Sequence, residues 1–395
     1  LRRVLRRAVR FGLKLGLEDA FLYKLVPVVA DTMQDFYPYL QEHVEFNQKL
    51  IKVEEDTFKK TLKNGQALLD EEISKAKDGK LSGEVVFKLY DTYGFPFELT
   101  QEIASESGLE VSREEFDVEM NKQKERARNA RNTKDSFATQ NAELMNFTQE
   151  STFIGYDHME CDGKIIALFK DGHMVDTLSD EGQVILDTTC FYAESGGQVA
   201  DAGTLSADGV MCKVTDVQKA RNKQHIHSVE IESGILEVGM SLHCHVDEAK
   251  RKATTANHSC THLLQSALKE VVGEHIHQAG SYVCDEYLRF DFNHFEKLTT
   301  KQLDEIEDLV NQYIAGAYPV TKEIMDIEEA KKSGATALFN EKYGDRVRVV
   351  TMGDVSKEFC AGCHVENTSQ IGLCKIISEE SIGSDARRIV AKTGY

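Results

Sequence analysis

The sequence has 395 residues but no tryptophan, only four prolines and no long apolar run. A helix that crosses a membrane needs about 20 consecutive apolar residues, so we expect no membrane association. The nine cysteines are scattered and odd in number, which excludes complete internal disulfide pairing and suggests no disulfide scaffold. Nothing resembles a signal peptide. The sequence therefore predicts a cytoplasmic protein.

Positive charge is also scarce. The sequence has 47 lysines and arginines against 66 aspartates and glutamates, a net charge of −19. This balance argues against general affinity for nucleic acids, although local basic sites remain possible. Apolar residues make up 41% of the chain, enough for two or three domains with true cores. The first residue is leucine rather than methionine, so we expect a piece of a longer protein.

Two basic helical faces stand out in the first third of the sequence. Residues 1–14 contain no acid, and a long helix that follows the capping box Ser112-x2-Glu115 ends in basic residues. The plain interpretation of each is a solvated surface helix. Phosphate groups are the natural complement of uncompensated basic charge, so we predict contacts with a phosphate-bearing partner at Arg2, Arg3, Arg6, Arg7, Arg10, Lys122, Lys124, Arg126 and Arg128.

The periodicity changes from helical to β-like near residue 150, after a polar linker at 132–141. Short β-prone segments separated by turn signals predict a barrel-like unit. Further on, helices and strands mix, with a helix expected at 298–315 and a strand at 346–352. The predicted fold is multidomain. It has an all-α helical region at residues 1–142, a β-barrel-like unit at 143–247 and an α+β domain at 248–395.

Two motifs a hundred residues apart have the composition of a metal site. His258-x3-His262 opens a segment of helical periodicity, and Cys360-x3-His364 repeats the spacing. Residues four apart on a helix lie on one face, and zinc usually takes four nitrogen or sulfur ligands. Each half alone is more often a pair of partly exposed side chains. Cys360-x2-Cys363-His364 also matches the attachment motif of c-type haem, which requires export.

A third motif lies in the predicted barrel. Gly196-Gly197 precedes Gln198, and adjacent glycines permit close backbone approach to a ligand. Thr189, nine residues earlier, could present a hydroxyl to the same pocket. A plain hairpin turn explains the glycines equally well.

These motifs together resemble the alanyl-tRNA synthetases. Residues 187–198, 258–264, 289–292 and 360–365 occur in that order in this family. Residues 1–10 resemble the end of its third class II catalytic motif, and residues 90–96 resemble its helical tRNA-recognition region. The resemblance covers the whole chain.

The resemblance implies a helical tRNA(Ala)-binding region followed by an editing domain that hydrolyses Ser-tRNA(Ala) or Gly-tRNA(Ala). The parent protein would ligate alanine to tRNA(Ala) with ATP and Mg²⁺, and an oligomerisation domain would follow downstream. Editing is needed because a pocket for alanine excludes glycine and serine only weakly. The implied site residues are Thr189, Gln198 and Cys360 for catalysis and His258, His262, Cys360 and His364 for zinc.

One position departs from the family pattern. Cys363 stands where the family usually has threonine, so either Cys360 or Cys363 could supply the thiolate. The spacing identifies no general base. Two other functions fit the residues: a free-standing editing hydrolase, and a non-catalytic RNA-binding module that zinc stabilises.

Overall fold

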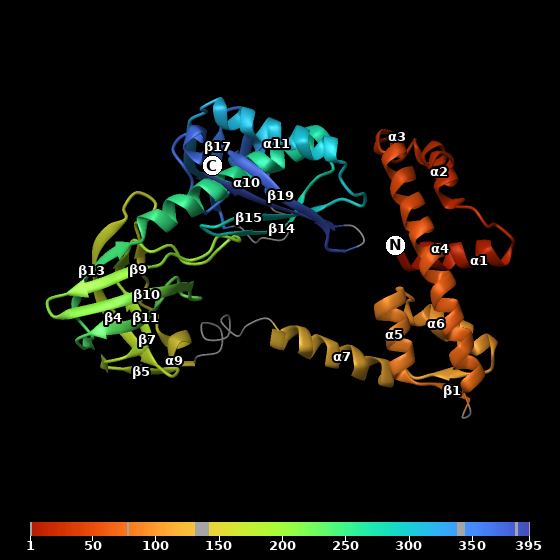
Figure 1. Ribbon diagram of the computed structural model, residues 1–395, viewed down its shortest axis with the longest axis horizontal. Helices are drawn as coiled ribbons and strands as arrows, with labels where there is room; N and C mark the ends of the chain where they lie inside the picture. The colour runs from red at the N-terminus through yellow and green to blue at the C-terminus, as the bar shows by residue number, and fades with distance from the viewer. Residues whose placement is uncertain (1, 77–78, 131–141, 338–343, 384–385, 395) are drawn as a thin grey trace. The chain divides into compact units, whose positions relative to one another are not determined.

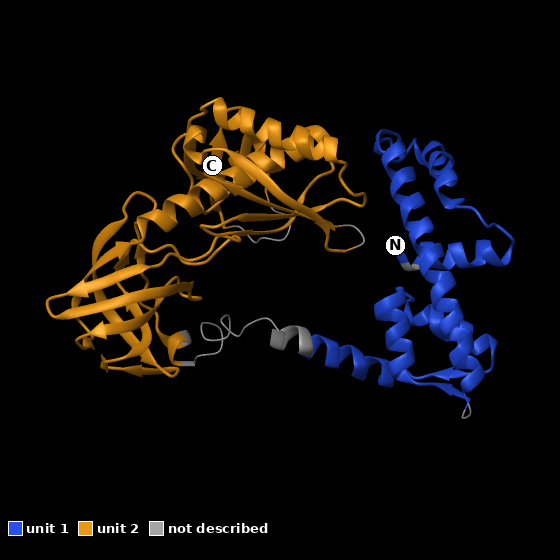
Figure 2. Ribbon diagram, viewed as in Figure 1, with its two compact units in different colours: residues 1–133 blue, residues 134–395 orange. Residues whose placement is uncertain are grey.

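The computed structural model describes residues 2–76, 79–130, 142–337, 344–383 and 386–394. The chain forms two compact units, residues 1–133 and 134–395 (Figure 2). The predicted linker at 132–141 lies outside the described residues. Among the described helices, none is both long and apolar enough to span a bilayer.

Unit 1 is helical, as the periodicity predicts (Figure 1). Its elements are α1 Arg2–Lys14, η1 Leu22–Leu25, α2 Val26–Met33, α3 Tyr39–Glu42, α4 Val44–Lys75, β1 Lys80–Leu81, α5 Gly83–Tyr93, α6 Phe97–Glu106, β2 Glu110–Val111 and α7 Arg113–Ala130. Pro27 lies in the first turn of α2, and Pro38 precedes α3. A proline lacks the N–H that a helix interior needs, so each proline lies at the start of its helix rather than inside it.

The capping box before α7 forms only in part. Ser112 Oγ accepts a hydrogen bond from Glu115 N at 3.3 Å. The Glu115 carboxylate instead accepts one from Gly83 N at 3.1 Å, which ties α7 to the start of α5. The core of the unit forms between α4, α5 and α6, around Phe58, Leu89 and Ile103.

Unit 2 begins with α9 Ala142–Asn146 and a closed six-stranded antiparallel barrel. The barrel strands are β4 Glu160–Lys170, β7 Glu181–Leu186, β9 Gly203–Ala207, β10 Val210–Lys219, β11 His225–Ser233 and β13 Ser241–Val246. Strand β13 pairs with β9 and also with β4, which closes the barrel. Smaller strands accompany it: β3 Thr152–Phe153, β5 His173–Val175, β6 Thr177–Leu178, β8 Thr188–Thr189 and β12 Leu236–Glu237.

The α+β part follows with α10 Glu248–Val272, whose N-cap Asp247 accepts a hydrogen bond from Lys250 N at 3.1 Å. The remaining elements are β14 Gln278–Val283, β15 Leu288–Asn293, α11 Thr300–Ala315, β16 Val320–Asp326, α12 Ile327–Lys332, β17 Arg346–Met352, β18 Ser356–Phe359, η3 Thr368–Ile371, β19 Cys374–Ser381 and β20 Ala386–Thr393. The sheet orders are β14-β15-β20-β19 and β16-β17-β18.

Helix α10 is the centre of this part of unit 2. Ten consecutive residues, 256–265, are all buried, so burial extends over every face of the helix here, and residues 267 and 268 are buried as well. A helix buried all round is surrounded by other elements. Helix α10 contacts β14, β15, β18, β20 and α11, so side chains on opposite faces of it lie in a protein interior.

Candidate metal centre

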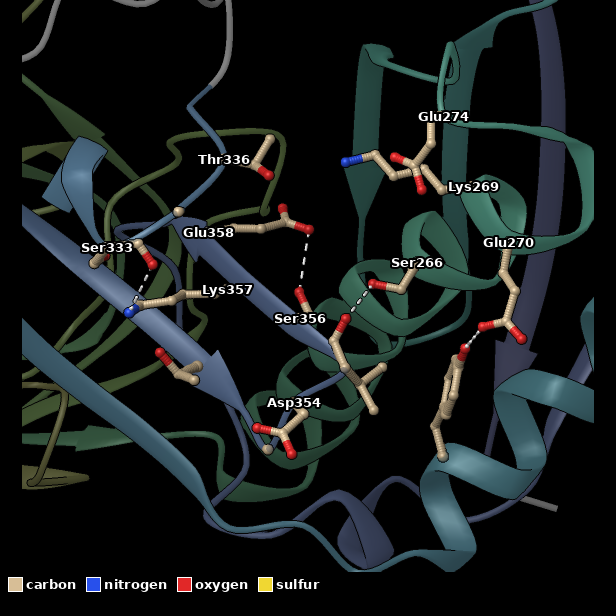
Figure 3. A pocket seen from close by; sticks show the side chains of 15 residues that line it. Ser266, Lys269, Glu270, Glu274, Ser333, Thr336, Asp354, Ser356, Lys357 and Glu358 are labelled. Atoms are coloured by element: carbon tan, nitrogen blue, oxygen red, sulfur yellow. Dashed lines mark hydrogen bonds between the residues drawn. The ribbon is translucent and has the colours of Figure 1, made fainter.

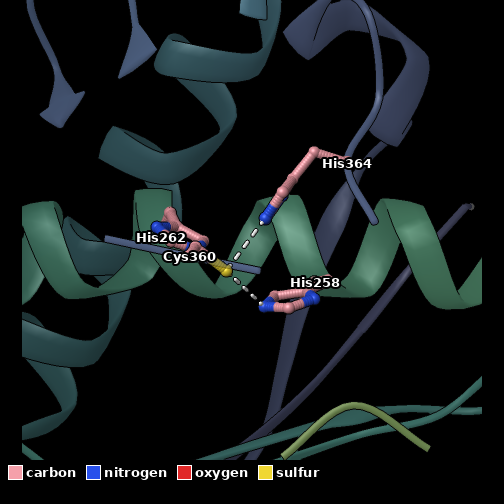
Figure 4. A group of neighbouring side chains, drawn as sticks. All are labelled: His258, His262, Cys360 and His364. Atoms are coloured by element: carbon pink, nitrogen blue, oxygen red, sulfur yellow. Dashed lines mark hydrogen bonds between the residues drawn. The ribbon is translucent and has the colours of Figure 1, made fainter. Parts of the chain in front are cut away.

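Four side chains converge beside α10 (Figure 4). His258 and His262 lie one turn apart on the helix, as their spacing predicts. Cys360 directly follows β18, and His364 lies four residues further on. One ligand atom from each of these four residues lies within 4.8 Å of all the others. The structure thus brings together the four residues that the sequence suggested for zinc.

The helical interpretation of the second motif is wrong. Residues 360–364 form no helix, and the chain from Phe359 to the start of η3 is irregular. Cys360 and His364 are therefore brought together by a loop rather than by one face of a helix. The loop geometry depends on hydrogen bonds to other segments, which local sequence does not reveal.

Each imidazole of the cluster has a partner at its outer ring nitrogen. The partners of Nδ1 are Gln198 Oε1 for His258 (2.7 Å), Glu358 Oε2 for His262 (3.0 Å) and Ser259 Oγ for His364 (3.1 Å). An amide oxygen can only accept, so His258 donates from Nδ1. His262 Nδ1 faces the Glu358 carboxylate as an ion pair, without the geometry of a hydrogen bond. Partners of this kind orient metal-binding histidines in proteins and leave Nε2 free for the ion.

The inner atoms have spacings that suit a tetrahedral ion. Cys360 Sγ lies 3.4 Å from His258 Nε2 and 3.2 Å from His364 Nε2. A tetrahedral zinc with ordinary Zn–S and Zn–N bonds would separate sulfur from nitrogen by about 3.5 Å. The donor set therefore fits zinc without a change of fold.

The charges in the cluster favour a thiolate. Burial raises the pKa of Cys360, but His258 and His364 more than offset it, and the pKa lies well below its ordinary value. Burial keeps the pKa of His364 well below its ordinary value. Burial also acts to lower the pKa of His262, but the Glu358 carboxylate raises it to about 10. A metal ion that enters the cluster takes the place of the proton on His262.

Cys363 lies outside this cluster. Its backbone N–H donates to Gln198 Oε1 at 2.9 Å, and its thiol is buried near Arg251 and Asp201. Burial raises the pKa of Cys363. The sulfur that faces the three imidazoles is that of Cys360.

Gln198 reaches the cluster from the barrel loop, residues 190–202 between β8 and β9. Gly197 has φ +85°, and a Cβ there would lie 2.7 Å from the backbone oxygen of Ser281. The loop joins β14, since Val283 N donates to Gly197 O at 2.7 Å and Val199 N donates to Val283 O at 3.0 Å. Gln198 is fully buried and its Oε1 accepts two hydrogen bonds. Its Nε2 has no hydrogen-bond partner among the described residues and is a free donor beside the cluster.

Thr189 makes its described hydrogen bonds inside the barrel. It is fully buried in β8, and its hydroxyl lies 2.8 Å from His227 Nε2. His227 Nδ1 lies 3.0 Å from Val184 O, which can only accept, so Nε2 accepts from the Thr189 hydroxyl. Thr189 Oγ1 also accepts from Phe191 N at 3.1 Å. The described hydrogen bonds of this hydroxyl are all within the barrel. A role for Thr189 in substrate selection stays a prediction.

A buried ion pair that the sequence did not reveal joins α10 to the barrel. Arg251 Nε donates to Asp201 Oδ1 at 2.7 Å, and both side chains are almost fully buried. Arg251 also donates to Gly155 O at 2.5 Å and to Cys190 O at 3.0 Å. The pair fixes α10 against the segment that directly follows Gln198. In the sequence, both residues look like ordinary surface charges.

Glu358, the partner of His262, also lines a cavity of about 750 Å³ (Figure 3). Its lining includes Lys269, Glu270, Asp354, Lys357 and Glu358. The Glu358 carboxylate, which pairs with His262, also accepts from Gln265 Nε2 at 3.1 Å and Ser356 Oγ at 3.2 Å. Glu358 thus connects a polar cavity to one ligand of the cluster.

Apart from Arg3, whose side chain is not described, the basic residues of α1 are compensated by acids from elsewhere in unit 1. Ion pairs join Arg2 to Glu54 (3.4 Å), Arg6 to Glu54 (2.9 Å), Arg7 to Glu102 (3.6 Å), Arg10 to Glu102 (3.3 Å) and Glu106 (2.9 Å), and Lys14 to Glu106 (2.7 Å). These glutamates lie on α4 and α6, out of reach of a local pattern. The assumption that this basic charge is uncompensated is therefore wrong.

The second basic face is described only in part. Lys122 pairs with Glu119 at 2.6 Å, and Lys124 is exposed. The side chains of Arg3, Arg126 and Arg128 lie outside the described part of the chain. Contacts between any of these residues and tRNA stay a prediction.

Comparison with known proteins gives two family matches. Residues 1–250 match the family of tRNA synthetases class II (A). Residues 347–390 match the second additional domain of threonyl and alanyl tRNA synthetases, and this range contains Cys360 and His364.

Individual relatives match over the full chain. Alanine--tRNA ligase of Bacillus subtilis (strain 168) is 49% identical over 400 residues, covering 100% of this chain. The corresponding proteins of Bacillus cereus (strain ATCC 14579) and Geobacillus kaustophilus (strain HTA426) are 50% and 49% identical over 399 residues. The chain spans only 45% of the length of each of these relatives.

Proposed function

Because this chain belongs to the class II (A) tRNA synthetases, we propose that it is the tRNA-recognition and editing part of an alanine--tRNA ligase. It binds tRNA(Ala) and hydrolyses Ser-tRNA(Ala) and Gly-tRNA(Ala). The parent protein ligates alanine to tRNA(Ala) with ATP and Mg²⁺. The editing proposal rests on the cluster of His258, His262, Cys360 and His364. Side chains outside the cluster orient its three imidazoles, and the amide Nε2 of Gln198 lies beside it without a hydrogen-bond partner among the described residues.

Three regions divide this work in our proposal. Residues 1–142 recognise tRNA, residues 143–247 form the barrel that supplies Gln198, and residues 248–395 hold the metal. This division is supported by the separate cores of unit 1, the barrel and the α+β part.

Zinc is the metal that we propose, held by His258, His262, Cys360 and His364. When bound, it would supply a fixed positive charge that positions the ester or the pocket around it. Four protein ligands would leave the ion without an open position, so the residues around it would have to contribute to the chemistry. Glu358 and Ser259 hold two of the ligand rings in place.

Gln198 acts directly on the substrate in this proposal. Its Oε1 is occupied by His258 and Cys363, which fixes the amide plane and directs Nε2 away from them. An N–H group fixed in this way can donate to the oxygen of the ester carbonyl, on which negative charge develops during hydrolysis. Because the amide is oriented before substrate binds, little reorganisation is needed.

The test is hydrolysis of purified Ser-tRNA(Ala), Gly-tRNA(Ala) and Ala-tRNA(Ala) by this chain. We expect release of serine and glycine while the alanyl ester is spared, and loss of hydrolysis in Cys360→Ala. Hydrolysis no faster than in Cys360→Ala, with tRNA(Ala) still bound, would favour the non-catalytic zinc-stabilised RNA-binding module. The alternative of a free-standing hydrolase is disfavoured by the synthetase family match over residues 1–250.

A further inference from the structure

The loop that carries Cys360 has no regular secondary structure of its own. It nevertheless has to place a sulfur atom within 3.2–3.4 Å of two imidazole nitrogens. In such a loop the backbone carbonyls need partners from other segments. Residues 360, 361 and 362 all find such partners, and two side chains provide them.

Arg348, in β17, holds the two outer carbonyls. Its Nη1 donates to Cys360 O and to Gly362 O, both at 2.9 Å. The backbone of Arg348 also accepts from Cys360 N at 3.0 Å. One residue thus contacts the first and last residues of the turn, and because β17 lies inside a sheet, the anchor is rigid.

Tyr156 holds the middle carbonyl. Its hydroxyl donates to Ala361 O at 2.6 Å, and the Arg348 guanidinium lies over its ring, 4.3 Å from the centroid. Tyr156 lies between β3 and β4, on the barrel side of unit 2, 205 residues before Ala361. The two anchors therefore support each other as well as the loop.

The loop has no room to shift without disturbing the cluster. A Cβ at Gly362 would lie only 1.9 Å from His258 Cε1, so the backbone passes directly against that ring. Gly362 N also donates to Cys360 Sγ at 3.4 Å. Movement of the turn would alter the contact with His258 and the position of the sulfur together.

We propose that Tyr156 and Arg348 are positioning residues that fix the Cys360 sulfur toward the three imidazoles. They act through the backbone of residues 360–362 and touch neither the ion nor the substrate. The positions of Tyr156 and Arg348 do not depend on the proposed function. Only the consequence rests on it, namely that editing requires the Cys360 sulfur to face the three imidazoles.

The test uses the whole chain loaded with Co²⁺, whose thiolate-to-metal charge-transfer absorption reports a bound sulfur. Tyr156→Phe removes the hydroxyl and keeps the ring, while Arg348→Met removes both donated hydrogen bonds and keeps most of the volume. Tyr313→Phe is the matched control, since it removes a tyrosine hydrogen bond (2.7 Å to Glu270) elsewhere in unit 2. Zn²⁺ affinity is measured in parallel by competition with a chelator.

We expect both variants to show a weaker charge-transfer band and an affinity for Zn²⁺ lowered by roughly tenfold or more, the usual effect of losing an outer partner of a metal site. The control should match the unaltered protein in both readouts. If both variants keep the band and the affinity, and lose only resistance to urea, the residues are structural and the proposal fails. Absence of the band in the unaltered protein would overturn it as well.

Failure of the editing proposal would look different. The unaltered chain would then show the charge-transfer band, and the two variants would lose it, while none of the three hydrolyses Ser-tRNA(Ala). If Arg348→Met does not fold, Tyr156→Phe decides alone, because it changes a single partly exposed hydroxyl.

Discussion

Gln198 Oε1 accepts a hydrogen bond from His258 Nδ1 at 2.7 Å, across 60 residues of sequence. The glutamine comes from the barrel loop and the histidine from α10. This bond fixes which nitrogen of His258 faces Cys360, and it also leaves the glutamine Nε2 free. The metal cluster and the proposed substrate contact therefore depend on one side chain.

Substitutions of Gln198 should separate these two roles. Gln198→Glu keeps an acceptor for His258 and Cys363 but replaces the free donor, so we expect hydrolysis of Ser-tRNA(Ala) to fall by about 10²–10³-fold with zinc content unchanged. Gln198→Met removes the acceptor as well and should also lower zinc affinity. The measurements are single-turnover hydrolysis and metal analysis. Full activity in Gln198→Glu would exclude the donor role.

Thr189→Val tests two ideas at once. The hydroxyl donates to His227 and accepts from Phe191 N in the barrel interior. Its loss leaves buried groups without partners, which should cost about 1–3 kcal/mol in the free energy of unfolding, measured by urea denaturation. If the hydroxyl also selects serine, the ratio of Ser-tRNA(Ala) to Ala-tRNA(Ala) hydrolysis should narrow. An unchanged ratio with lowered stability would assign Thr189 a purely structural role.

The barrel should lose stability in mild acid because of His227. This residue is fully buried, and burial lowers its pKa to about 4. The unfolded chain takes up a proton below about pH 6.5, whereas the folded chain does so only near pH 4. Stability contributed by neutral His227 is therefore present above pH 6.5 and falls with pH between about 6.5 and 4.

The loss from this one group should be on the order of 3 kcal/mol. The measurement is urea denaturation of the native chain and of His227→Asn, in which an amide replaces the ring near Nδ1. The variant should be less stable at neutral pH but should show a smaller decline in acid. Burial and, less strongly, His227 lower the pKa of His225 to about 3, and the variant removes the second cause, which also makes its decline in acid smaller. Parallel pH curves for the two proteins would contradict the prediction.

Reversal of charge should have different effects at two basic residues of unit 1, Arg10 and Lys124. Arg10 is buried and paired with Glu102 and Glu106, so Arg10→Glu should destabilise unit 1. Lys124 is exposed, so Lys124→Glu should weaken tRNA(Ala) binding, reduce its salt dependence and leave stability unchanged. Filter binding across a salt series measures the affinity for tRNA(Ala) and its salt dependence. Lys301→Glu in unit 2 is the exposed control. If Arg10→Glu and Lys124→Glu bind tRNA(Ala) as tightly as the control Lys301→Glu, contacts between tRNA and Arg10 or Lys124 are excluded.

The sequence predicted the local features of the fold and of the site. Helical spacing identified His258 and His262 as neighbours on α10, and turn signals identified the barrel. The sequence did not reveal Tyr156, Arg348 or Glu358, because each acts on a segment that only the fold brings near. For the same reason, the acids that neutralise α1 could not be foreseen. Cys360 and His364 were identified from their composition and spacing, and they do lie with the two histidines, although the helical reason given for that spacing was wrong.

The residues of the cluster are synthesised at different times. The sulfur ligand is 102 residues beyond His258, and β14, β15, α11, β16 and β17 lie between them. A ribosome makes the chain from its N-terminus, so α10 can form with both of its imidazoles before any thiol of the cluster exists. Two imidazoles hold zinc far more weakly than a complete set of four ligands. Capture of the proposed metal by the complete cluster would thus be a late event in the biogenesis of unit 2, and the nascent helix would form without it.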